Sequence, residues 1–237
     1  MARKDLALES ENPYWISISD LITGLLIIFI LTLCYYILSF NEKTTELAEG
    51  NIKRALILKA IQKDLESRGI KVKVDFEHGI LRLPEGILFD SGKAQIKEEG
   101  LKVLRALGPV LYDVLTKPEF KDTVETIFIE GHTDNVPIKN AAFPSNWELS
   151  TQRAINTWRE LLRVTPELKN LKNKSNEPLF SCSGYADTRP VASNETPAGR
   201  RENRRIDFRF SMITPKIEEK SLIKEIKTKI KHIEEAK

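Results

Sequence analysis

The sequence contains only two cysteines and three histidines. Cys34 lies in an apolar segment and Cys182 lies far along the chain, so the two cannot plausibly pair and no disulfide framework is indicated. The histidines lack the spacing of metal ligands, both with one another and with the cysteines: they are His78, His132 and His232. We therefore expect neither a disulfide-stapled fold nor a metal or other cofactor.

An activated nucleophile is also missing. Ser150, His132 and Asp134 offer the side chains of a catalytic triad, but no nucleophile elbow surrounds them, so we do not expect an enzyme. The net charge of +3 comes from interspersed acids and bases, and Glu202 interrupts the basic run GRRENRR at residues 199–205. This pattern argues against nucleic-acid binding.

Lysine and arginine are absent from residues 16–40, ISISDLITGLLIIFILTLCYYILSF. Tyr14-Trp15 and Tyr35-Tyr36 bracket this segment, as aromatic residues do at membrane interfaces. Their spacing of about 21 residues gives a helix of roughly 31 Å, close to the thickness of a hydrocarbon core. The segment is too long for a signal-peptide core and no A-x-A cleavage site follows it. We expect a single, uncleaved transmembrane helix.

Asp20 is the only acid in that segment. A carboxylate below the interface costs a few kcal/mol or more, so it is rarely kept without a partner or a use. One interpretation is that Ser19 or Asp20 simply caps the start of the helix. The other follows from Thr23 and Gly24, which share its helical face and make a small, polar stripe suited to close packing or a wet pathway. On that interpretation Asp20 and Thr23 carry an ion.

The chain after the apolar segment alternates between strand and helix patterns. Residues 71–83 read as a β-hairpin with its turn at His78-Gly79, and residues 94–115 carry apolar side chains at helical spacing. Further segments follow: a strand at 126–130, a helix at 147–164, and strands at 179–185 and 206–212. This alternation predicts one domain at 71–212, an α/β two-layer sandwich preceded by the single transmembrane helix.

Three segments lie outside that domain and the membrane span. Residues 1–15 form the N-terminus, and residues 41–70 read as a linker with some helix, interrupted at Gly50 and ended at Gly69. In the tail at 213–237, isoleucines form a seam of under two heptads: Ile223, Ile226, Ile230 and Ile233. Such a short helix is marginal alone. The tail is either a solvated extension or a helix that docks on the domain or on a second copy.

Several motifs resemble a known family. Gly131-His132-Thr133-Asp134, then Asn146 to Ser150 with Arg153-Ala154, look like the signature of the OmpA-like peptidoglycan-binding domain. The resemblance covers about residues 81–210 and includes four further stretches: Leu88 to Gly92, Gly184-Tyr185, Arg189-Pro190, and Asn194 to Ile206. The first of them resembles the strand that opens such a domain, so we expect a strand there. The combination of SNWELS with an upstream HTD is closer to the MotB branch. Residues 15–24 are similar to the spanning helix of MotB-type stator subunits, and NPYWISISDL resembles the B subunit of the Zorya anti-phage defence system.

The resemblance implies a ligand and its site. Domains of this family bind the diaminopimelate of the peptidoglycan stem peptide, which presents an ammonium and a carboxylate together. It implies that Asp134 accepts from the ammonium and that Arg153 forks onto the carboxylate. Thr133, Asn146, Leu149 and Arg204 are the implied neighbours, although Asn146 is alternatively a helix cap, Leu149 a core residue and Arg204 an ion-pair partner. Taken alone, these motifs also fit an ordinary turn and a solvated helix face.

The resemblance also implies a cellular role. It implies a homodimeric B subunit of an ion-driven, proton-type stator in the inner membrane, anchored to peptidoglycan inside a ring of MotA-like subunits. The Zorya-like segment favours antiviral defence, and the alternatives are a flagellar motor subunit and a passive wall anchor. Counted literally, the basic residues flanking the span argue against a cytoplasmic N-terminus. The identity of the domain overrides that count, because a wall-binding domain must be periplasmic.

Overall fold

The computed structural model describes residues 13–213, and the chain divides into two compact units, Met1–Leu47 and Ala48–Lys237. Within the described residues, the helices are α1 (Pro13–Ser67), α2 (Glu85–Leu88), α3 (Glu98–Leu115), α4 (Asn146–Val164), the 3₁₀ helix η1 (Pro166–Asn170) and α5 (Pro197–Asn203). The strands are β1 (Lys73–Asp75), β2 (Ile80–Pro84), β3 (Val124–His132), β4 (Phe180–Gly184) and β5 (Arg205–Met212). The expected N-terminal segment, up to residue 12, and the tail from residue 214 lie outside the described residues.

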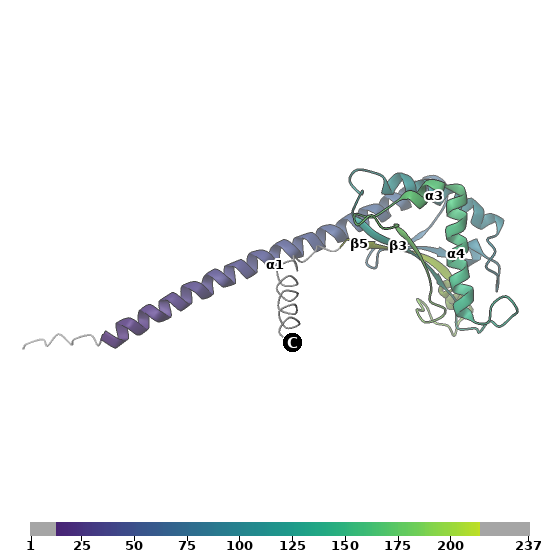
Figure 1. Cartoon of the computed structure of the whole chain (residues 1–237). Helices are drawn as coiled ribbons and strands as arrows, with labels where there is room; N and C mark the ends of the chain where they lie inside the picture. The colour runs from purple at the N-terminus through teal and green to yellow at the C-terminus, as the bar shows by residue number, and fades with distance from the viewer. Residues whose placement is uncertain (1–12, 214–237) are drawn as a thin grey trace, which may run out of the picture. The chain divides into compact units, whose positions relative to one another are not determined.

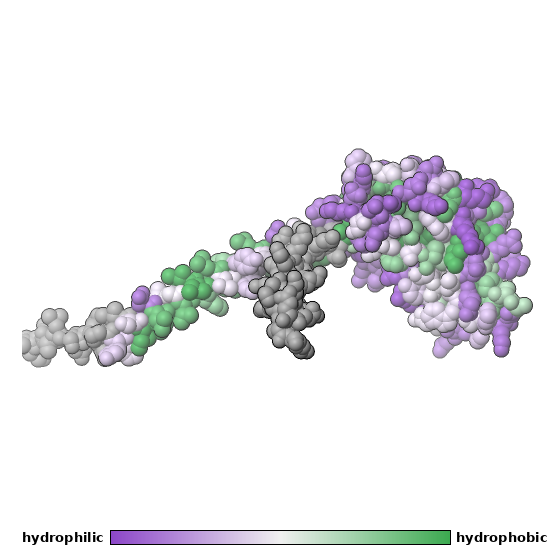
Figure 2. Space-filling model, viewed as in Figure 1, coloured by the Kyte–Doolittle hydropathy of each residue, from purple (hydrophilic) through white to green (hydrophobic). Residues whose placement is uncertain are grey.

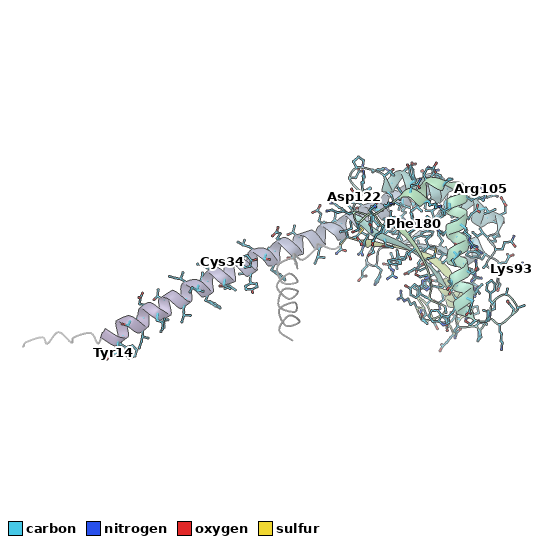
Figure 3. The ribbon with its side chains drawn as sticks, viewed as in Figure 1. Tyr14, Cys34, Lys93, Arg105, Asp122 and Phe180 are labelled. Carbon is cyan, nitrogen blue, oxygen red and sulfur yellow. The ribbon has the colours of Figure 1, made fainter. Side chains whose placement is uncertain are left out.

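The first unit consists of the N-terminal part of α1. From Ser17 this helix is long and apolar enough to cross a membrane, with a mean hydropathy of 2.6 in its most apolar window and no residue of that window buried. Apolar side chains cover this part of the helix (Figure 2, green), and Figure 3 shows side chains pointing outward along it between Tyr14 and Cys34. By length and composition, α1 is the candidate for the predicted transmembrane helix.

The C-terminal part of α1 belongs to the second unit. The expectation that Gly50 interrupts the helix is wrong, because α1 continues through it to Ser67. The last turns bury four apolar side chains in the core of this unit: Ile57, Leu58, Ile61 and Leu65. Gly69 ends the helix as predicted, with φ of 76° and the Ile70 amide donating to the Leu65 carbonyl at 2.9 Å, which is a Schellman motif. Part of the segment expected to be a linker therefore completes the domain's core.

The sheet has the strand order β1-β2-β5-β3-β4, and all pairs are antiparallel except β3 and β4. Helix α4 connects the parallel pair, as a parallel connection requires a crossover. Helices α3 and α4 lie on one face of the sheet (Figure 1). Ile127 and Ile129 of β3 and Phe208 of β5 are fully buried in the core with the apolar face of α3. The predicted α/β two-layer sandwich is confirmed.

The opposite face of the sheet carries charged side chains. Asp207 accepts from Arg82 at 3.0 Å and from Arg205 at 2.9 Å, and Glu130 pairs with Arg209. The chain that follows β4 covers part of this face, because Tyr185 stacks on His132 at 5.4 Å and Arg189 lies 3.7 Å from the Tyr185 ring centroid. Paired charges and an aromatic cover explain how these polar residues are buried without a second helical layer.

One predicted strand takes a different form. Leu88 to Gly92 was expected to open the domain as a strand, but the structure places the short helix α2 at Glu85–Leu88 and only an isolated bridge between Phe89 and Ile96. Pro84 at the N-cap of α2 favours this turn, because its φ of −60° suits the start of a helix. Glu85 is thereby turned into the interior of the domain.

Candidate ligand-binding site

A cavity of about 360 Å³ opens at one edge of the second unit. Its walls come from α2, from the turn that follows β3, from the first turns of α4 and from the end of α5. All six residues that the sequence suggested as wall-binding line this cavity: Thr133, Asp134, Asn146, Leu149, Arg153 and Arg204. The fold thus brings together residues that are up to 71 positions apart in the chain, since 204 − 133 = 71.

A local capping motif fixes where α4 begins. Ser145 is the N-cap: its hydroxyl accepts from the Trp147 amide at 3.2 Å and donates to the Glu148 carboxylate at 2.5 Å. These bonds satisfy orphan groups in the first helical turn. Asn146 is therefore not the cap, and its side chain is free for another contact. Leu149 and Arg153 follow one and two turns later on the face that lines the cavity.

Two glycines let α4 approach the sheet closely. Gly131 in β3 pairs with Gly184 in β4, and both face the start of α4. A Cβ atom on Gly131 would lie 2.0 Å from the Ser150 carbonyl oxygen, and one on Gly184 would lie 2.1 Å from the Thr151 hydroxyl. Any side chain at these positions would push α4 outward. The glycine pair therefore sets how close Arg153 lies to the rest of the cavity.

Asn146 holds the turn that carries Asp134. Its side-chain amide donates to the carbonyls of Asp134 at 3.3 Å and Val136 at 3.1 Å, and its oxygen accepts from the Ile138 amide at 3.3 Å. Asp134 also accepts from the Val136 amide at 3.1 Å through Oδ1. These side-chain bonds satisfy backbone groups of the loop that have no partner in a helix or a strand. Asn146 thus positions Asp134 rather than leaving it on a mobile turn.

A chain of charged groups crosses the cavity. Arg153 pairs with one oxygen of Glu85, Arg204 Nε lies 2.6 Å from the other, and Arg204 Nη1 lies 2.5 Å from Asp134 Oδ2. Arg153 also donates through Nε to the Lys93 carbonyl at 2.9 Å, beside the loop that Figure 3 labels at Lys93. The order Arg153–Glu85–Arg204–Asp134 alternates in sign. Asp134 and Arg153 are thus brought into one cavity but do not pair with each other directly.

Burial shifts the ionisation of the two innermost groups. Glu85 and Arg153 are only 3% and 2% exposed. Burial raises the pKa of the Glu85 carboxyl, against the opposing pull of Arg153 and Arg204. Burial likewise lowers the pKa of the Arg153 guanidinium, and Glu85 opposes that shift. Each group is therefore held in its charged form chiefly by its partner.

Thr133 contributes an unused polar group. Its hydroxyl oxygen is buried and has no hydrogen-bond partner among the residues that the structure describes, yet the residue lines the cavity. A buried hydroxyl without a partner costs free energy, so a ligand that bonds to it gains that energy back. Leu149 gives the adjacent wall an apolar surface. The cavity therefore offers one apolar wall, an unpaired hydroxyl and both signs of charge.

Sequence reasoning missed Glu85. It stands between Pro84 and Gly86, after the predicted hairpin at 71–83 and before the stretch from Leu88 to Gly92. An acid next to a predicted strand and before an apolar run was the available signal. Its two partners lie 68 and 119 positions later, since 153 − 85 = 68 and 204 − 85 = 119, so the sequence gives no local sign of the contact.

His132, although part of the same motif as Asp134, lies on the other face of the sheet. Its Nε2 is 3.7 Å from Asp207 and 3.9 Å from Glu130, but arginines already pair with both carboxylates. Burial, then Arg205 and other arginines, lower the pKa of His132 to about 3. The ring is therefore neutral near pH 7 despite the nearby acids, and neither ring nitrogen has a hydrogen-bond partner among residues 13–213.

Asp20 and Thr23 are not among the residues that line this cavity and belong to the part of α1 in the first unit. Both side chains are exposed, and the Thr23 hydroxyl donates to the Ser19 carbonyl one turn earlier at 2.7 Å. Within residues 13–213 no group of three or more His, Cys, Asp or Glu side chains could hold a metal ion. The structure therefore presents two separate candidate sites, one on the apolar helix and one in the folded domain.

Comparison with known proteins shows which proteins this chain resembles. The OmpA family matches residues 88–204. Motility protein B of Bacillus subtilis (strain 168) is 35% identical over 167 residues, which make up 70% of this chain and 56% of that protein. Zorya protein ZorB of Escherichia coli O139:H28 is 25% identical over 206 residues, 85% of this chain and 81% of that protein.

A solved structure shows the same fold. A MotB-like protein from Desulfovibrio vulgaris matches with a TM-score of 0.55 and 22% identity, over 72% of this chain and 98% of that one. The chain spans little more than half of the Bacillus protein, 56%. The matched segment contains all six cavity residues with predicted roles, and Arg204 is its last position. Residues 88–204 match the OmpA family, and these similarities support a MotB-type, OmpA-like protein related to ZorB.

Proposed function

We propose that this protein anchors an ion-driven stator complex of the inner membrane to peptidoglycan. The observation that carries the proposal is the cavity, which Asp134 and the guanidinium groups of Arg153 and Arg204 line together. The free end of the diaminopimelate of a stem peptide carries an ammonium and a carboxylate on the same carbon atom. Opposite charges placed side by side in a cavity suit such a ligand, because each of its groups finds a charge-assisted partner.

The geometry supports a proposed role for each residue. Asp134 accepts from the ligand ammonium, and Arg204 and Arg153 face its carboxylate. Thr133 gives its free hydroxyl to the ligand, Leu149 packs against the aliphatic part, and Asn146 keeps Asp134 in place. Arg153 is the most buried member, so its contribution to the ligand is limited to the part of its guanidinium that reaches the cavity wall.

The apolar helix supports the membrane part of the proposal. We infer a single-pass inner-membrane protein with its N-terminus in the cytoplasm and its folded domain in the periplasm. Asp20, with Thr23 one turn away, is the proposed ion carrier, and the partner is a MotA-like subunit that forms the rest of the ion path. A carboxylate on a lipid-exposed helix is costly, so a second helix surface or a wet pathway next to Asp20 is needed. We propose a homodimer within that complex.

Two stator systems are candidates for the cellular role. The match to ZorB extends over 85% of this chain and 81% of that protein, which supports an antiviral defence complex of the Zorya type. The match to Motility protein B has the higher identity, 35%, which supports a flagellar motor subunit. A wall anchor that conducts no ion is the remaining alternative, and Asp20 is the residue that argues against it.

The wall-binding part is tested with the full-length protein in detergent. Wild type should co-sediment with purified sacculi of the diaminopimelate type, and Asp134→Asn should lower the affinity at least tenfold. That loss corresponds to one charge-assisted contact of about 1.5–3 kcal/mol. Asp113→Asn on the exposed side of α3 is the matched control and should bind like wild type. Equal sedimentation of Asp134→Asn and wild type would show that the cavity does not hold the wall ligand.

A further inference from the structure

The carboxylate of Asp134 already has partners for both oxygens. Oδ1 accepts from the Val136 amide at 3.1 Å, and Oδ2 lies 2.5 Å from Arg204 Nη1. The Arg204 guanidinium therefore already occupies the position beside Asp134 that the ammonium of a ligand would take. Since like charges repel at such distances, an ammonium binds Asp134 more favourably when Arg204 moves away from it.

Arg204 has a second partner that permits this movement. Its Nε lies 2.6 Å from Glu85 Oε2, and its own carbonyl accepts from the Glu85 amide at 3.0 Å. The Arg204 side chain is 30% exposed, whereas that of Glu85 is 4% exposed and is also held by Arg153. Glu85 is thus a fixed, buried anchor, and the far end of Arg204 is the accessible part of the charge chain.

We propose that Arg204 determines specificity by exchanging partners: it leaves Asp134 and binds the carboxylate of the ligand, while Asp134 takes the ligand's ammonium. The inference rests on the proposed wall-binding function and adds a selection rule to it. Before binding, the chain Arg153–Glu85–Arg204–Asp134 contains three ion pairs. A ligand with both charges replaces the Arg204–Asp134 pair by two new pairs.

A ligand with an ammonium alone does not increase the number of ion pairs. It replaces the Arg204–Asp134 pair by a single pair with Asp134 and leaves the end of Arg204 without an acceptor. No ion pair is gained, and a guanidinium end that was paired loses its partner. Arg204 therefore acts as an internal competitor that only a zwitterionic group displaces with a net gain. Selection arises from a contact present in the free protein as well as from contacts to the ligand.

The test uses two small probes on the full-length protein in detergent. meso-Diaminopimelate carries two zwitterionic ends, and cadaverine is the same carbon chain and amines without the carboxylates. Wild type should bind meso-diaminopimelate at least tenfold more tightly than cadaverine by calorimetry. In Arg204→Gln, affinity for meso-diaminopimelate should fall at least tenfold while affinity for cadaverine stays equal or rises, because Asp134 is no longer occupied.

Three further variants make the outcome decisive. Arg201→Gln, an exposed position of the same short helix, should retain the wild-type ratio of affinities. Arg204→Lys keeps the positive charge and serves as the test if Arg204→Gln unfolds. It should retain a preference for meso-diaminopimelate. Asp134→Asn should weaken both probes. If Arg204→Gln loses both probes equally, or loses neither, the exchange is overturned while wall binding stands. If wild type binds neither probe nor sacculi, the proposed function fails with it.

Discussion

Glu85 and Arg153 form an ion pair in which each residue is almost completely shielded from solvent. Removal of one member of such a pair leaves the other charge buried without compensation, which costs about 3–5 kcal/mol. We therefore expect Glu85→Gln to lower the free energy of unfolding by about 3 kcal/mol, measured by denaturant titration of the full-length protein. Glu99→Gln, on the exposed side of α3, should change it by less than about 0.5 kcal/mol.

A paired variant tests the same contact in the opposite direction. Replacement of a whole buried ion pair by apolar or neutral groups of similar size is often neutral. Glu85→Gln combined with Arg153→Met should therefore recover much of the stability that Glu85→Gln loses. A double variant as unstable as the sum of the two single variants would show that the pair is not the cause.

His132 should make the protein sensitive to acid. Its pKa is lowered from 6.5 to about 3, so the unfolded chain binds a proton in this range that the folded protein does not. Stability from this group is complete above pH 6.5 and is lost as the pH falls toward 3, at about 1.4 kcal/mol per pH unit. Since both ring nitrogens lack partners among the described residues, His132→Phe keeps the stacking on Tyr185 and removes the titration.

The measurement is the free energy of unfolding of wild type and His132→Phe at several pH values. The difference between the two should change by about 3 kcal/mol between pH 6.5 and roughly pH 4, with wild type losing more. Both proteins have the same carboxyl groups, so the contributions of these groups to the pH dependence cancel in the comparison. A difference that is independent of pH would mean that His132 is protonated in the folded protein.

Gly131→Ala should disturb both stability and ligand binding. The added methyl would lie 2.0 Å from the Ser150 carbonyl oxygen, so α4 must move away from the sheet. Overpacking of this kind costs roughly 1–3 kcal/mol, and backbone rather than a flexible side chain must give way here. We expect a lower melting temperature and weaker sacculus binding. Gly86→Ala is the control, because its Cβ would meet nothing within 4 Å.

Asp20→Asn should separate anchoring from ion transport. The amide keeps the size of the side chain but cannot bind and release a proton, so insertion and sacculus binding should persist while ion-dependent function is lost. A charge that moves through the membrane potential releases about 2.3 kcal/mol per 100 mV, which is the energy at stake. Motility or phage protection, measured with the partner subunit present, is the readout. Retained function in this variant would overturn the role of Asp20 as the ion carrier.

The sequence was sufficient for the order of the main helices and strands and for six of the residues that line the cavity. Apolar periodicity located α3, α4 and the strands within a few residues, because those elements bury one face. The motif residues Thr133, Asp134 and Asn146 converge because they follow β3 and begin α4. Both predictions rest on local patterns, which a single sequence displays.

The pairing inside the cavity depended on tertiary contacts and was not predictable in the same way. Arg204 rather than Arg153 contacts Asp134, and Glu85 links the two arginines. No periodicity reports which oxygen a guanidinium selects. Gly50 failed as a helix breaker for a related reason: a single glycine costs about 1 kcal/mol in a helix, and the four core side chains in the last turns of α1 outweigh it.

Those last turns of α1 also limit how the protein can be divided and when it can fold. A fragment that starts at residue 71 lacks Ile57, Leu58, Ile61 and Leu65, each worth about 1.5–3 kcal/mol when buried. Their sum, roughly 6–12 kcal/mol, is comparable with the whole stability of a domain. The folded domain therefore cannot be excised at its first strand. In the proposed topology the core of the domain therefore closes only when residues 57–65 lie on the same side of the membrane as the rest of the domain.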